Sequence, residues 1–260
     1  MPRSPRARRA RPLPLTLLFA LAACPAEEGG PGAEVRYSES REPCAERDPL
    51  RQLYFGDLHF HTRHSWDAYG YHLTVSPGES YSFARGEPVR LPPLDEEGRG
   101  TREVRLSRPL DFAAATDHAE FLGETALCTT PGSPSYEAAA CAAFREMGAV
   151  AVARWGVELA GGDGKRRQAA ICGEDGERCR AAAREVWRQL RQAAEEAYDR
   201  RISCSFVTFV GYEYTATPNV SNEHRNVIFR NGTVPDLPVS FYEQGTRWGL
   251  WRALKQICLD

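Results

Sequence analysis

One short stretch of the chain gathers histidines at a spacing that suits metal binding. Three of the six histidines, His59, His61 and His64, lie close together, and Asp67 follows six residues after His61. Residues two apart in an extended strand point to the same side, so His59 and His61 can present two imidazoles to one ion. Imidazole nitrogen suits zinc, iron and manganese, and Asp67 adds a harder oxygen ligand. This stretch therefore predicts the first part of a metal site.

Three further segments place acids or histidines at the ends of predicted strands. These residues are Asp117 and His118 after the apolar run 110–116, Glu213 after the run 205–212, and His224 just before the run 225–229. A carboxylate after the most apolar strand is costly to bury unless it is paired or metal-bound, so Glu213 could bridge two ions. Asp117 could be a ligand or could orient a neighbouring imidazole. Four such segments together favour a site with more than one metal ion.

The elements that carry these residues predict an α/β fold. Strands are expected at 53–60, 110–116, 205–212 and 225–229, helices at 135–160, 176–200 and 245–259, and a hairpin within 85–108. Strands that alternate with long helices favour a mainly parallel sheet covered by helices, with functional residues at the carboxyl ends of the strands. In the last helix, Trp248 and Trp251 fall on one stripe with Leu254 and Ile257, so we expect these tryptophans to pack into the core.

The ordered set of motifs resembles the polymerase and histidinol phosphatase (PHP) superfamily. The motifs are His59-x-His61-Thr62-x-x-Ser65-x-Asp67, then Thr116-Asp117-His118, then Glu213 and His224. More narrowly, the segments 55–59, 116–123, 211–215 and 224–230 resemble a bacterial family catalogued as domain of unknown function 3604. The resemblance runs from about Leu53 to the end of the chain.

This resemblance implies a distorted (β/α)7 barrel with two or three divalent metal ions, either zinc, manganese or iron, and a phosphoesterase activity on a small-molecule substrate. The implied metal ligands are His59, His61, Asp67, His118, Glu213 and His224. Asp117 and Glu213 are the predicted catalytic residues, and the proton shuttle would be either Asp117 or a family histidine missing from this sequence. His64 and His72 have no counterpart in the family, and we expect them at the surface or behind the ligands.

The sequence departs from the family pattern after His224. The family adds a further histidine and a terminal Asp-x-His pair, and neither appears between His224 and Asp260. By this comparison, residues 49–260 are expected to form the N-terminal part of such a barrel, incomplete at the C-terminus. A half-barrel would leave an open sheet edge, so weak metal binding and low activity of this chain are expected.

The N-terminus predicts export. Five arginines precede the short apolar run Leu13–Ala22, which is too short to span a bilayer and is typical of a secretory signal peptide. Residues 21–24 read Leu-Ala-Ala-Cys, which resembles a bacterial lipoprotein signal with Cys24 lipidated. Residues 1–24 are thus expected to be the signal peptide, and the Pro/Gly/Glu-rich residues 25–48 a flexible tether. The protein would then be a periplasmic or cell-surface lipoprotein held at the membrane through Cys24.

Composition adds two expectations. The net charge of −2 gives no reason to expect nucleic acid as a partner. Without Cys24, seven cysteines remain and none forms a C-x-x-C pair, so they favour disulfides over a thiolate zinc site, with at least one cysteine outside any pair within the chain.

Two other functions stay open at this point. Barrel amidohydrolases, which cleave amides and lactones, also begin with an H-x-H strand. They typically use a carboxylated lysine, however, and neither Lys165 nor Lys255 lies at a strand end. A lipid-anchored binding protein with a degenerate metal site is the third possibility. The number of bound metal ions separates the hydrolases, with two or three, from the binding protein, with one or none.

Overall fold

Three parallel strands form the central sheet of the protein. In the computed structural model, β1 (Gly56–Phe60) pairs with β4 (Phe112–Ala115), and β4 pairs with β5 (Val207–Thr208), in the order β1-β4-β5. Beyond β4, His118 makes a parallel bridge to Glu213 in β6 (Gly211–Ala216). β6 in turn pairs antiparallel with β7 (Glu223–Ile228). The ends of β1 and β4 are thereby brought beside the β6–β7 pair.

The structure describes residues 44–45, 52–161, 166–218 and 221–258. The predicted signal peptide with Cys24, and nearly all of the predicted tether, lie outside these residues. Within them, no helix has both the length and the apolar character needed to cross a bilayer.

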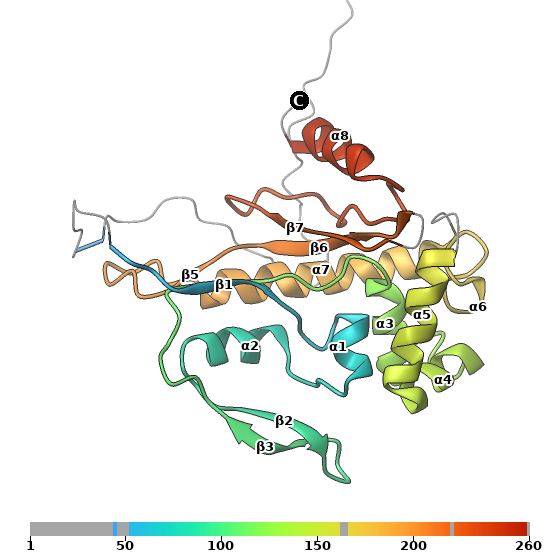
Figure 1. Cartoon of the computed structure of the whole chain (residues 1–260), viewed down its shortest axis with the longest axis horizontal. Helices are drawn as coiled ribbons and strands as arrows, with labels where there is room; N and C mark the ends of the chain where they lie inside the picture. Colours follow the sequence, from blue (N-terminus) through green and yellow to red (C-terminus); the bar gives the residue numbers. More distant parts are fainter. Residues whose placement is uncertain (1–43, 46–51, 162–165, 219–220, 259–260) are drawn as a thin grey trace, which may run out of the picture.

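Helices cover the central strands, and α7 is the longest of them. The helices are α1 (Trp66–Gly70), α2 (Pro77–Ala84), α3 (Leu122–Thr129), α4 (Ala139–Met147), α5 (Ala149–Gly161), α6 (Ala169–Cys172), α7 (Glu177–Ala197) and α8 (Arg247–Cys258). On α7, Val186, Trp187, Leu190 and Ala194 lie at helical spacing and are buried, so one stripe of the helix joins the core. In Figure 1, α8 lies on the opposite side of β6 and β7 from α7.

The prediction of an α/β fold is confirmed, as are the helix at 176–200 and the hairpin within 85–108, formed by β2 (Val89–Leu94) and β3 (Gly100–Val104). The described strands form one three-stranded sheet and two two-stranded pairs and do not close into a barrel. The seven-stranded barrel therefore stays a prediction.

Several expected elements differ in detail. The expected helix at 135–160 is two helices, because Gly148 between α4 and α5 has a φ of 50° that glycine tolerates best. The expected strand at 205–212 is divided into β5 and β6, so Glu213 lies within β6 and not after it. β7 is antiparallel to its neighbour because a short connection joins it to β6.

Burial differs from expectation in two places. The apolar run 53–60 suits a buried strand, but among the described strands β1 pairs with β4 alone, and Leu58 is 39% exposed. Trp248 and Trp251 were expected in the core, yet they are 62% and 44% exposed. The helix α8 does bury a face, but Gly249 and Leu250 provide its fully buried positions. The tryptophans belong to the stripe that the sequence pattern assigned to the core, but they lie outside the face that α8 buries.

Three disulfides link distant or looped segments of the described chain. They are Cys44–Cys204, Cys128–Cys141 and Cys172–Cys179. The first joins residues 160 positions apart and fixes the end of the predicted tether to the loop before β5. The expectation that the cysteines form disulfides is therefore confirmed for these six.

Candidate metal centre

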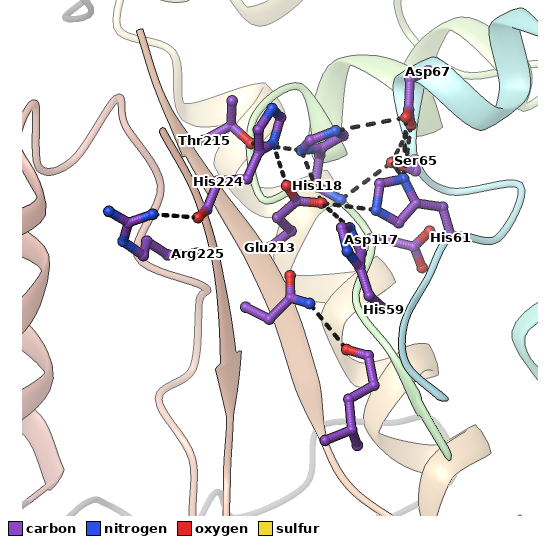
Figure 2. A network of polar contacts seen from close by, with 12 residues as sticks. His59, His61, Ser65, Asp67, Asp117, His118, Glu213, Thr215, His224 and Arg225 are labelled. Carbon is purple, nitrogen blue, oxygen red and sulfur yellow. Dashed lines mark hydrogen bonds and ion pairs between the residues drawn. The ribbon is translucent and has the colours of Figure 1, made fainter. Parts of the chain in front are cut away.

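The carboxylate of Glu213 is the centre of a cluster of imidazoles. This side chain lies in β6 and is 1% exposed. Its Oε2 is 3.0 Å from Nε2 of His59 and 2.8 Å from Nε2 of His61. Its Oε1 is in close contact with Nδ1 of His224 (Figure 2). One buried carboxylate thus faces ring nitrogens from two different strand regions.

A second carboxylate, Asp67, lies on the other side of His61. Both of its oxygens are 3.1 Å from Nδ1 of His61, and Oδ2 is 3.6 Å from Nε2 of His118. Ser65 donates a hydrogen bond of 2.6 Å to Oδ1 of Asp67 and accepts one of 3.2 Å from the backbone N–H of His118. Ser65 thereby connects the first histidine motif with the second.

Strand geometry explains why these side chains meet. His59 lies in β1 and His61 just beyond it, two residues apart and on the same side. The backbone N–H of Glu213 donates to the carbonyl of Asp117, and the carbonyl of Glu213 accepts from Ala119, so His118 is held directly beside β6. In the β6–β7 ladder, His224 lies opposite Thr215, two residues after Glu213. Strand geometry and backbone pairing thus determine how each of these histidines is placed relative to Glu213.

The structure brings together all six residues that were expected to be metal ligands. Their donor atoms form three overlapping groups, each with atoms within 4.8 Å of one another: His59, His61 and Glu213; His61, Asp67 and His118; and His118, Glu213 and His224. Each group could hold a metal ion, and three protein donors are the number that catalytic zinc sites use. A neutral imidazole has one free lone pair, so each histidine can bind one ion. The first and third groups share only Glu213, so both can hold a metal ion at the same time.

The charges in this cluster suit a cation. Burial opposes ionisation of Glu213, but the hydrogen bond from His61 and the nearby imidazoles outweigh it and lower its pKa to about 2. Burial likewise opposes protonation of His61, but its hydrogen bonds with Asp67 and Glu213 raise its pKa to about 10. In the metal-free protein a proton on His61 therefore supplies the positive charge that the two carboxylates require, and a metal ion could replace it.

Asp117 is placed differently from what the sequence suggested. It is 1% exposed, and its two oxygens accept hydrogen bonds from the backbone N–H of Thr62 at 2.6 Å and from the Thr62 hydroxyl at 2.9 Å. Burial raises the pKa of this carboxyl group. Asp117 does not belong to any of the three donor groups. Its hydrogen bonds go to Thr62, the residue after His61, and not to an imidazole, so Asp117 fixes the loop that carries His61. The proton-shuttle role stays a prediction.

His64 and His72 lie outside the donor groups. The sequence pattern did not assign a role to Thr215, whose hydroxyl contacts two of the clustered histidines, or to Asn226, whose side-chain amide donates to the Leu58 carbonyl at 3.0 Å. The available signal was the alternation of side chains between the two faces of a strand. It places Thr215 on the same face of β6 as Glu213, and Asn226 on the same face of β7 as His224.

The cluster is accessible from the side of His59 and His224, whose side chains are 54% and 44% exposed. His61, His118 and Glu213 are largely buried behind them. Arg225, the cation next to His224, extends away from the cluster and donates to the His224 carbonyl at 2.7 Å (Figure 2). A ligand entering from this side would meet imidazoles first and carboxylates beyond them.

Comparison with known proteins identifies a family without an assigned function. No curated protein and no solved structure matches the chain. One family profile does match, over residues 48–260, and it is described as "Protein of unknown function (DUF3604)". Because this match covers most of the sequence, the chain belongs to the DUF3604 family.

Proposed function

We propose that this protein is a metal-dependent hydrolase of the phosphoesterase class, with a PHP-like centre of two or three divalent ions. One observation carries the proposal: Glu213, a buried carboxylate, is contacted by ring nitrogens of His59, His61 and His224, with His118 and Asp67 adjoining. A buried carboxylate needs a counter-charge, and imidazoles supply one only when they are protonated or metal-bound.

The donor groups suggest how two ions would be held. His59 and His61 would hold one ion with one oxygen of Glu213, and His118 and His224 would hold a second with the other oxygen. Asp67 would complete the cluster or bind a third ion. When bound, divalent ions in such a centre polarise a phosphoryl oxygen and acidify water. The protein's own part is to fix these donors from four segments of backbone and to exclude solvent behind Glu213.

The charge balance favours an anionic substrate. Two divalent ions carry four positive charges, and Asp67 and Glu213 carry two negative charges, so a centre with neutral imidazoles keeps an excess of two positive charges. A phosphate ester would neutralise this excess, whereas a neutral amide or lactone would not. Arg225, the cation next to His224, extends away from the cluster, so the ions themselves would provide the attraction.

The experiment is a substrate screen on metal-reconstituted protein. The protein lacking residues 1–24 would be loaded with zinc or manganese and assayed with p-nitrophenyl phosphate, bis-p-nitrophenyl phosphate, a nitroanilide and a lactone. The proposal predicts hydrolysis of a phosphoester that disappears with a chelator and returns with metal. If only the nitroanilide or the lactone were cleaved, the protein would instead be an enzyme of the amidohydrolase class. Metal binding of one ion or fewer, without turnover, would favour the binding protein.

We also propose that the domain works outside the cytoplasm, as the N-terminal signal suggests. The three disulfides support this proposal, because such bonds persist in oxidising compartments. Radioactive palmitate labelling of the wild type and of Cys24→Ala in a bacterial host tests the lipid anchor. Labelling is expected in the wild type alone, and equal labelling of both would contradict it.

A further inference from the structure

The hydroxyl of Thr215 contacts two of the clustered histidines at the ring nitrogens that also face Glu213. Its Oγ1 is 2.9 Å from Nδ1 of His118 and 3.1 Å from Nδ1 of His224. Thr215 is 3% exposed, and His118 is 4% exposed. Water therefore has little access to Nδ1 of His118, whereas the His224 side chain is 44% exposed and its Nδ1 also contacts Glu213.

Three constraints hold the hydroxyl in this place. Thr215 lies directly opposite His224 in the β6–β7 ladder, and it shares a face of β6 with Glu213. Its backbone N–H donates a hydrogen bond of 3.0 Å to the buried Glu120 carboxylate. Threonine is also β-branched, so few χ1 rotamers are open to it. The contact with both rings follows from this backbone position.

The hydrogen-bond count limits the tautomers of the two histidines. A hydroxyl has one hydrogen to donate, so at most one of the two Nδ1 atoms can accept from Thr215. If both rings are neutral, the other ring must donate its own Nδ1–H to the hydroxyl. Nδ1 of His224 also contacts the Glu213 carboxylate, which only accepts, so His224 is the ring that carries hydrogen on Nδ1. That hydrogen would have to move to Nε2 before Nδ1, the nitrogen that faces Glu213, could bind a metal ion.

The same hydroxyl can serve His118 in two ways. It can donate to Nδ1 of His118, which leaves a hydrogen on Nε2, the atom 3.6 Å from Asp67 Oδ2. It can also accept from Nδ1 of His118, which leaves Nε2 with a lone pair for a metal ion. Turning the hydroxyl thus exchanges a hydrogen-bonded state for a metal-binding state.

We propose that Thr215 is a positioning residue of the metal centre, whose hydroxyl orients the rings of His118 and His224 and couples their tautomers. This inference rests on the proposed function for the role of the metal, although the tautomers themselves exist without it. Partners that orient metal-bound histidines typically contribute about 10- to 100-fold in metal affinity.

The test uses three variants of the protein lacking residues 1–24. Thr215→Val keeps the branched shape and removes the hydroxyl, whereas Thr215→Ser keeps the hydroxyl. Thr217→Val is the matched control, because Thr217 is also buried but donates to the Leu159 carbonyl at 2.9 Å. The readouts are zinc affinity by chelator competition and, on metal-free 15N-histidine-labelled protein, the imidazole tautomers by long-range 1H–15N NMR. Thermal melting verifies that each variant is folded.

Thr215→Val is expected to lower zinc affinity about 10- to 100-fold and to change the NMR patterns of both His118 and His224. Thr215→Ser and Thr217→Val should resemble the wild type in both readouts. The inference is overturned if Thr215→Val keeps wild-type affinity and unchanged tautomers. If Thr215→Val does not fold, loss of the wild-type tautomers in Thr215→Ser would overturn it as well. A wild type that binds no zinc would contradict the proposed function, while the tautomer readout would still decide the inference.

Discussion

Two buried glutamates in this protein lie in opposite electrostatic settings. Glu124 in α3 is fully buried, and both of its oxygens lie 3.1–3.2 Å from Nη1 of Arg167. Arg167 also binds Glu243 at 2.8 Å and stacks over the Tyr242 ring at 4.5 Å. Glu213 is equally buried, but imidazoles surround it and no arginine contacts it in the described structure.

The difference lies in whether the counter-charge is permanent. A guanidinium is always protonated, so the Glu124–Arg167 pair is closed to a metal ion. Cys172 and Cys179 also lie within ligand distance of Glu124, but they form a disulfide with each other and offer no thiolate. Imidazoles can release their proton and accept a metal in its place. The surroundings of a buried carboxylate thus distinguish a structural ion pair from a candidate metal centre.

The largest expected effect is on metal binding. Glu213→Gln removes the carboxylate that two donor groups share, so loss of measurable zinc binding is expected. This effect should exceed the roughly 100-fold loss in metal affinity that follows removal of a partner that only orients a ligand. Glu124→Gln should keep the wild-type affinity in the folded protein. Chelator competition measures both. Zinc binding by Glu213→Gln at wild-type strength would remove Glu213 from the centre.

The next largest effect is expected on stability, and there the Glu124–Arg167 pair should matter more than Glu213. Arg167→Met leaves the fully buried Glu124 without its cation, so a loss of about 3–5 kcal/mol in the free energy of unfolding is expected. Glu124→Gln is expected to cost less, because Arg167 keeps its ion pair with Glu243. Urea unfolding of the metal-free proteins measures this. A loss below about 1 kcal/mol in both variants would show that the pair is not the structural element described above.

A smaller change is expected from the neighbouring disulfide. Replacing Cys172 and Cys179 together with alanine opens a short loop, for which chain entropy gives about 2.5 kcal/mol of lost stability. The metal content should not change, because neither sulfur serves the centre. If the wild type bound an additional ion after reduction, and Glu124→Gln abolished that binding, Glu124 would also be a metal ligand and the contrast between the two glutamates would be wrong.

The smallest effect is a pH dependence confined to the Glu213 side. The pKa of His61 is raised to about 10, so below that pH a metal ion must displace a proton, and zinc affinity should rise by up to tenfold per pH unit from pH 7 to 9. The metal-free protein should behave oppositely. A raised folded-state pKa stabilises fully below the unfolded value near 6.5, and this stabilisation is lost as the pH rises through 10.

Isothermal titration of zinc at several pH values, with melting of the chelated protein, measures both trends. His61→Gln is the matched control, since it keeps a hydrogen-bonding side chain without the titration. An affinity that does not vary with pH in the wild type would show that His61 is not the protonated ligand.

The sequence indicated the six clustered side chains because their signals are local. His59 and His61 are two apart, and His118 and Glu213 follow apolar runs, so strand geometry predicts that they lie near one sheet edge. The partner of Asp117 was not predictable, because the Thr62 contact depends on how the loop after β1 folds back.

Burial was predicted less well than element type. The stripe on α8 identified an amphipathic helix, but periodicity does not say where its buried face ends, and Trp248 and Trp251 lie beyond that edge. The exposure of β1 depends on the strand order, which no local pattern specifies. The Arg167–Glu124 pair joins segments 43 residues apart and left no signal in the sequence.

The central claim is that the side chains around Glu213 form a metal centre, and elemental analysis tests it most directly. The protein lacking residues 1–24 would be incubated with zinc, manganese and iron, desalted and compared with a His59→Ala/His61→Ala double variant. Two or more ions per chain in the wild type, lost in the variant, are the expected result. A folded wild-type protein that retains no metal, or a variant that retains as much as the wild type, would contradict the claim.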